Sequence, residues 1–122
     1  MTADPGRPTT PGSVRGPARH DIPAIDEAAL AAGRAADVLL DAARARGSAR
    51  WERYLAPIPE ALFDGDLRDL RAAARSGRSA FGPKDSVMDA LPTAPCIAFR
   101  DALDVLLKRI ARYEAETGSR GR

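Results

Sequence analysis

The sequence contains few of the residues on which catalytic and metal sites depend. It has one histidine and one cysteine among 122 residues. A single histidine excludes a histidine-rich zinc site and a two-histidine relay. A single cysteine excludes an intrachain disulfide, as is typical of a reducing compartment. Glycine-rich loops of the kinds that bind nucleotide phosphates are also missing. We therefore expect a protein that is not an enzyme, uses no cofactor and binds no metal.

Long apolar runs and aromatic side chains are scarce as well. No run approaches the ~18–20 apolar residues of a membrane-spanning helix, and the N-terminus lacks the apolar core of a secretory signal. Aromatic residues make up only 5% of the chain, although hydrophobic residues make up 44%. Alanine fills the difference, and it favours helices and close helix contacts. These features predict a soluble cytoplasmic protein without a membrane partner.

Charge of one sign is not in large excess. The formal net charge is +2 and the pI is about 9.1, values too mild to indicate nucleic-acid binding by themselves. Arginine outnumbers lysine by 17 to 2, which is typical of the coding bias of a GC-rich bacterial genome. The arginine content alone is therefore no evidence for a site.

The strongest pattern lies in residues 93–117, where bulky apolar residues recur with the ~3.6-residue period of a helix. The residues of this stripe are Phe99, Leu103, Leu106, Ile110 and Tyr113. Smaller apolar residues on both sides widen the stripe, so we expect this helix to contact more than one neighbour. We expect Thr93 to cap the helix, Gly118 to end it in a left-handed turn, and Cys96 to be buried beside the stripe.

The remaining segments also predict helices. A second long helix is expected over residues 24–46, with a core face made mostly of alanine, and a mid-length helix over residues 66–81. Proline and glycine interrupt the chain elsewhere and predict short helical turns at 48–56, 59–63 and 86–91. Short connections favour antiparallel neighbours. The expected fold class is therefore all-α: a small antiparallel helical bundle with two long helices, one mid-length helix and short connecting helical turns.

The chain is expected to hold one domain. Residues 1–20 contain four prolines, three glycines and little to bury, which is typical of a disordered leader. We expect its Arg7, Arg15 and Arg19 to make no more than weak contacts with anions. A single helical domain then spans residues 21–117. Residues 118–122 are expected to form a disordered basic tail.

One charged pattern stands out within the mid-length helix. Arg68, Arg71, Arg75 and Arg78 recur at helical spacing, and the helical period turns them about 100° from the apolar face. Lys84 follows just past the end of this helix. Guanidinium groups in a row suit phosphates or carboxylates, because each makes forked hydrogen bonds. These five residues are the candidate anion-binding or partner-binding site.

The same arginine stripe has a purely structural interpretation. Carboxylates of neighbouring helices, for which Asp37, Asp41 and Asp104 are the candidates, would neutralise the arginines and leave a solvated charged face. No aromatic residue is interleaved with the arginines, which argues against a platform for single-stranded nucleic acid.

Two functional hypotheses follow from these patterns. The first is a small non-enzymatic helical protein that acts by protein–protein interaction, as an adaptor or regulator, because its apolar sectors are broad and its catalytic groups are few. A protein partner or a homodimer would cover those sectors. The alternative is binding of an anion or a nucleic acid through the arginine stripe. A steep salt dependence would distinguish the alternative from the first hypothesis.

Overall fold

The computed structural model describes residues 18–83 and 86–120, apart from the side chains of residues 119 and 120. Its helices are α1 (Pro23–Ala45), α2 (Ala49–Leu55), α3 (Ile58–Asp64), α4 (Leu67–Ser79), α5 (Val87–Ala90) and α6 (Thr93–Arg120), preceded by the 3-10 turn η2 (Arg19–Asp21). No strand occurs in these described ranges. The predicted all-α fold class is confirmed.

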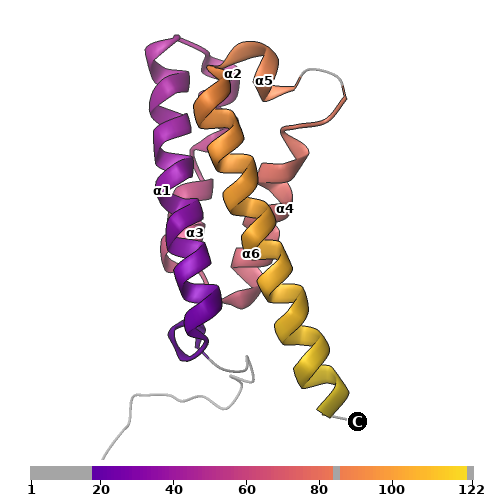
Figure 1. The fold of residues 1–122 in the computed structure, drawn as a ribbon. Coiled ribbons are helices and arrows are strands. Elements are labelled where there is room, and N and C mark those ends of the chain that lie inside the picture. The colour runs from indigo at the N-terminus through magenta and orange to yellow at the C-terminus, as the bar shows by residue number, and fades with distance from the viewer. Residues whose placement is uncertain (1–17, 84–85, 121–122) are drawn as a thin grey trace, which may run out of the picture.

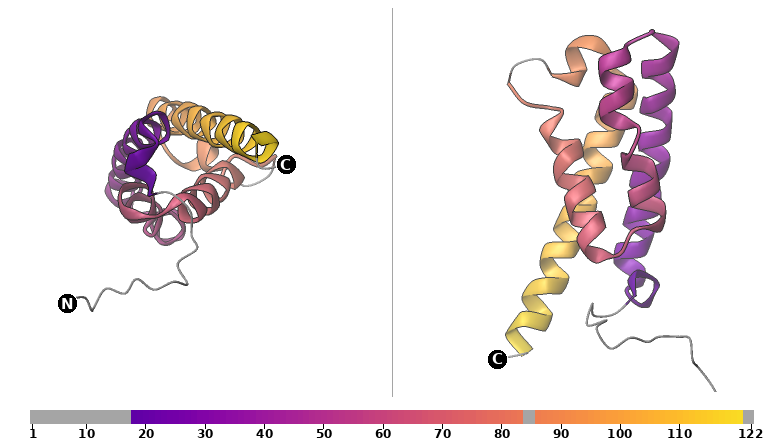
Figure 2. Two further views of the ribbon diagram at one scale, coloured as in Figure 1. Left: turned by 90° about the horizontal axis from the view of Figure 1, so that it is seen from below. Right: turned by 180° about the vertical axis from the view of Figure 1, so that it is seen from behind.

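The two long helices lie side by side and antiparallel, and the shorter helices complete the bundle around them (Figure 1). Seen along the molecule, α1, α6, α4 and α3 surround a common core (Figure 2). The last turns of α6 extend beyond the other helices. Helical residues run from Arg19 to Arg120, so both ends reach slightly past the predicted range of 21–117. Most of the predicted leader and the last two residues lie outside the described part of the chain.

The core is built on the apolar stripe of α6. The side chains of Phe99, Leu103 and Leu106 are fully buried, and Ile110 is 2% exposed. Tyr113, the last member of the stripe, is only half-buried, because it lies where α6 leaves the bundle. α1 buries the bulky side chains of Ile25, Leu39 and Leu40, and all its other buried side chains are alanines. These are Ala28, Ala29, Ala32, Ala36 and Ala43. The small alanine side chains allow the two long helices to approach closely.

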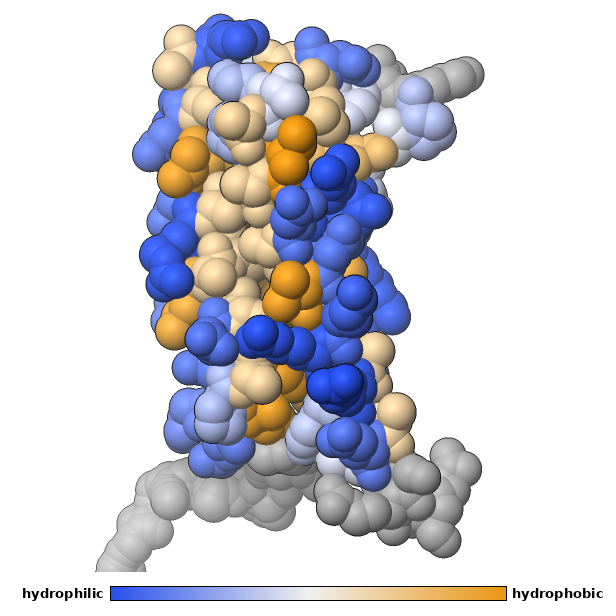
Figure 3. Space-filling view, in the orientation of Figure 1, coloured by the Kyte–Doolittle hydropathy of each residue, from blue (hydrophilic) through white to orange (hydrophobic). Residues whose placement is uncertain are grey.

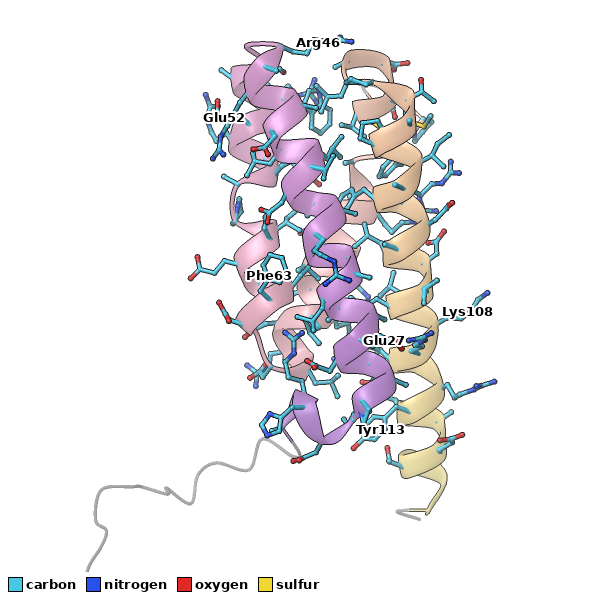
Figure 4. All side chains as sticks on the ribbon, turned by 60° about the vertical axis from the view of Figure 1, so that its left-hand side comes forward. Glu27, Arg46, Glu52, Phe63, Lys108 and Tyr113 are labelled. Carbon is cyan, nitrogen blue, oxygen red and sulfur yellow. The ribbon has the colours of Figure 1, made fainter. Side chains whose placement is uncertain are left out.

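Two glycines mark the tightest contacts between helices. A Cβ added at Gly77 of α4 would lie 2.6 Å from Leu103 Cδ1 and 2.9 Å from Phe99 Cζ. A Cβ added at Gly33 of α1 would lie 2.7 Å from Cε1 of Phe63, whose ring extends from α3 toward α1 (Figure 4). Gly77 therefore sets the approach of α4 to α6, and Gly33 sets the approach of α3 to α1.

The helix ends follow local sequence signals in most places. Gly47 adopts φ +68° directly after α1, a conformation that glycine tolerates best. Asp66 caps α4, because its carboxylate accepts a hydrogen bond of 2.9 Å from the Asp69 N–H. The Asp69 carboxylate accepts one of 3.2 Å from the Asp66 N–H in return. Ser86 caps the short helix α5 in a similar way.

Two predictions for the ends of α6 are wrong. Gly118 does not end the helix, which continues to Arg120. Glycine permits a left-handed turn but does not require one, and this part of α6 lies beyond the neighbours that would redirect the chain. Thr93 is the first helical residue rather than a cap outside the helix. The Cys96 N–H donates instead to the Pro92 carbonyl, at 3.3 Å.

Candidate functional site

Half of the arginine stripe is neutralised by α6. Arg71 forms an ion pair with Glu114, and Arg78 Nε lies 2.9 Å from Asp104 Oδ1. Asp104 is one of the three carboxylates that the sequence offered for this role. The other two, on α1, pair with no arginine of the stripe in the part of the chain that the structure describes. These contacts tie α4 to α6, so they are first of all structural.

The other two arginines of the stripe face solvent. Arg68 and Arg75 are exposed, and neither has a carboxylate partner within the described residues. They are two helical turns apart, roughly 10 Å along the axis of α4. The fifth predicted site residue, Lys84, lies outside the described residues. Within the described residues, the candidate anion site therefore keeps two guanidinium groups that have no carboxylate partner.

A second surface, which the sequence did not reveal, runs along the seam between the two long helices. We define the α1–α6 face by two stripes of small apolar side chains that are exposed or half-buried. It consists of Ala31, Ala35, Val38 and Ala42 on α1 and Ala94, Ala98, Ala102 and Val105 on α6. Figure 3 shows it as a band of apolar surface with charged residues along its borders.

The two valines are the most unusual members of this face. Val38 is 57% exposed and Val105 is 44% exposed, and both are among the few large apolar side chains that the described residues leave in solvent. On α6, the sequence pattern assigned Val105 and its neighbouring alanines to the edge of a wide core stripe. The α1 stripe has helical spacing of its own, and this signal was available in the sequence. Neither stripe alone reveals that the two lie next to each other.

One end of the α1–α6 face is closed by a polar contact. Arg109 Nη1 donates to the Ala24 carbonyl at 2.7 Å and lies 3.2 Å from Glu27 Oε1. This contact joins the two long helices across the seam, whereas Lys108, at the preceding position of α6, extends into solvent (Figure 4). The open apolar part of the face therefore lies between the Arg109 contact and the other end of the bundle.

The titratable side chains of the described residues form no arrangement typical of a catalytic site. Cys96 is fully buried, as predicted, and burial raises the pKa of its thiol. Its Sγ lies 3.8 Å from the Val87 carbonyl and 4.0 Å from the Leu91 carbonyl, so it is a packed, protonated side chain. No group of histidine, cysteine, aspartate and glutamate in the described ranges could hold a metal ion. Nor does any described helix combine the length and the apolar character that a bilayer crossing requires.

Comparisons with protein-family models, with curated proteins and with solved structures found no match for this chain. The α1–α6 face and the exposed arginines of α4 are therefore the two candidate functional surfaces of the described residues.

Proposed function

We propose that this protein catalyses no reaction and acts by binding another protein through the α1–α6 face. The observation that supports this is the exposure of Val38 and Val105, 57% and 44%, on a surface otherwise lined by alanine. Fully burying a valine contributes roughly 1.5–3 kcal/mol, and about half of that remains available at each position. Apolar faces rimmed by polar residues are typical of protein interaction sites.

The shape of this face favours a helical partner. Alanine side chains allow a docked helix to approach to an interaxial distance of about 8–10 Å. A partner helix with bulky apolar residues at helical spacing would fill the shallow seam and bury both valines. A second copy of this chain would instead pack the same alanine and valine side chains against their equivalents, and this pairing would be isologous.

Photo-crosslinking tests this proposal with a built-in control. The variant Val105→Cys adds one exposed thiol, which is labelled with a photoreactive maleimide, while buried Cys96 stays unmodified. We expect one discrete crosslinked product. Its mass is twice that of the chain if the partner is a second copy, and another fixed mass if the partner is a different protein in native lysate. Adding Val38→Glu should abolish this product. The matched control is Ala115→Cys, which is exposed on the same helix but away from the seam.

The crosslinking result can contradict the proposal in two ways. If Val105→Cys and Ala115→Cys give the same pattern of products, the α1–α6 face has no selective partner. If the product persists unchanged with Val38→Glu, the partner does not contact the apolar seam. In either case the proposal fails.

The alternative function is anion or nucleic-acid binding by α4. It is favoured by one observation: Arg68 and Arg75 are exposed without carboxylate partners in the described part of the chain. Binding to RNA or DNA should then weaken as salt rises, and the Arg68→Ala/Arg75→Ala variant should bind less tightly and with a shallower salt slope. Arg53→Ala/Arg112→Ala is the control of equal charge. If both variants lose the same binding affinity, the nucleic acid is held only by nonspecific attraction to positive charge.

A further inference from the structure

Away from the α1–α6 face, α3 and α4 lie side by side on the other side of the bundle (Figure 2, right), and their side chains line a groove. It consists of two adjoining hollows of about 240 and 340 Å³. The first is lined by Pro57, Ile58, Ala61, Asp69, Ala72, Ala73 and Ser76. Most of these side chains are apolar. They form an apolar floor, against which a bound chain would bury proline or aliphatic side chains.

One end of this groove is acidic. The second hollow is lined by Glu60, Asp64 and Asp69 together with Pro57, Ala61 and Gly65. None of the described residues lining either hollow is basic. Glu60 and Asp64 are exposed and have no ion-pair partner among the described residues. The groove therefore combines an apolar floor with unbalanced negative charge, which complements a cationic segment.

The chain enters the bundle beside this acidic end. Arg19 is buried, and its Nη1 donates to the Leu62 carbonyl at 2.6 Å and to the Gly65 carbonyl at 3.2 Å. Gly65 itself lines the acidic hollow. The described chain therefore begins within one arginine side chain of the loop between α3 and α4. Arg15 is four residues before Arg19, a reach of at most roughly 14 Å for an extended chain.

The sequence of that preceding segment fits the groove. Residues 1–17 contain two arginines, Arg7 and Arg15, against one acidic residue, Asp4. Four of the seventeen residues are proline, and proline-rich chains lose less conformational entropy when they bind in an extended form. Because the segment is tethered next to the groove, its effective concentration there is on the order of millimolar.

We propose that residues 1–17 of this chain bind in the α3–α4 groove, with Arg15 against Glu60 and Asp64 and the proline-rich part over the apolar floor. Arginine suits the acidic end because it makes forked hydrogen bonds to carboxylates. This inference is independent of the proposed function, because the groove shares no residue with the α1–α6 face. The full-length chain is its own ligand at this site.

Paramagnetic relaxation enhancement in the full chain tests this inference. A nitroxide is attached to Thr9→Cys; the parent protein, treated in the same way, checks that buried Cys96 takes no label. We expect stronger broadening of the Ser76 and Ile58 amide signals than of the Ala24 signal. An undocked segment would do the opposite, because Ala24 lies only six residues after Ala18, where the segment joins the described chain.

Two charge variants decide whether the acidic end holds the segment. Arg15→Gln, or Glu60→Gln with Asp64→Asn, should each abolish the excess broadening at Ser76. About 1 M salt, which shortens the Debye length to ~3 Å, should reduce it. The inference is overturned if Ala24 is broadened most in the parent sequence, or if the Ser76 broadening survives both charge variants. It is also overturned if the broadening appears only between a labelled chain and a separate isotope-labelled chain, because the ligand would then be a second copy.

Discussion

At the scale of single residues, glycine has two different uses in this protein. Gly47 supplies a positive φ after α1, a role that its position in the sequence predicts. Gly33 and Gly77 are instead inside helices, where glycine is unfavourable by roughly 0.8–1 kcal/mol relative to alanine. Their missing side chains make room for Phe63 in one case and for Leu103 and Phe99 in the other. The loss of helix propensity is the cost of a close helix contact.

We expect Gly77→Ala to lower the free energy of unfolding by about 1–3 kcal/mol, in spite of the better helix propensity of alanine. The new methyl would meet Leu103 and Phe99, which are fully buried and have little room to move. Gly33→Ala should cost less, because the Phe63 ring that it meets is only partly buried. Urea unfolding of both variants measures the difference. A stabilised Gly77→Ala protein would show that α4 and α6 are not in tight contact.

At the scale of elements, α4 is held to α6 by contacts of two kinds. Apolar packing around Gly77 and Leu70 lies toward the core, and two ion pairs lie along its rim. The rim pairs are partly exposed, with the Arg78 and Asp104 side chains 39% and 49% accessible. Exposed ion pairs contribute about 0–1 kcal/mol because water and salt screen them. Packing therefore determines where α4 lies, and the ion pairs mainly neutralise arginine.

This division of roles predicts the behaviour of the Asp104→Asn/Glu114→Gln variant. Each substitution should cost less than about 1 kcal/mol of stability, while Arg71 and Arg78 become free to join Arg68 and Arg75. Elution from a heparin column should move to clearly higher salt. Asp101→Asn/Glu116→Gln changes the net charge equally, at exposed positions of the same helix. If both variants shift equally, the stripe has no anion-binding property beyond net charge.

At the scale of the whole molecule, Arg19 connects the start of α1 to the end of α3 and the loop that follows it. Its guanidinium contacts the carbonyls of Leu62 and Gly65 at the end of α3 and the carboxylate of Asp26 on α1, at 2.7 Å. Helix C-termini leave carbonyls without partners inside the helix, and the arginine supplies the missing donors. The sequence pattern had assigned Arg19 to a leader with weak anion contacts. That assignment is incorrect, because the partners of Arg19 are distant in the sequence.

Arg19→Ala should lower the free energy of unfolding by roughly 1–3 kcal/mol, since it leaves buried carbonyls without a donor. Arg19→Lys should recover only part of the loss, because an ammonium cannot reproduce the forked geometry of a guanidinium. Chemical denaturation followed by circular dichroism measures both variants. An unchanged midpoint for Arg19→Ala would mean that this corner is held without the arginine.

Much of the fold could be predicted from residue spacing. The apolar stripe of α6, the alanine face of α1 and the cap at Asp66 depend on neighbours one to four positions away, so local sequence encodes them. The candidate site could be predicted only in part. The spacing placed four arginines on one edge of α4, but which of them are neutralised depends on carboxylates of α6. The α1–α6 face was missed because an exposed stripe and a buried stripe have the same period.

Local sequence patterns were enough to predict that this chain is helical, where most of its helices begin and end, and which face of α6 enters the core. Those outcomes follow from hydrogen bonds and side-chain spacing within a few residues. Three features depend on the packing of the helices: Arg68 and Arg75 have no carboxylate partner among the described residues, Val38 and Val105 share an exposed face, and Arg19 is buried. Charge pairing and burial depend on contacts between segments that are distant in the sequence. The spacing of residues within one helix does not determine those contacts.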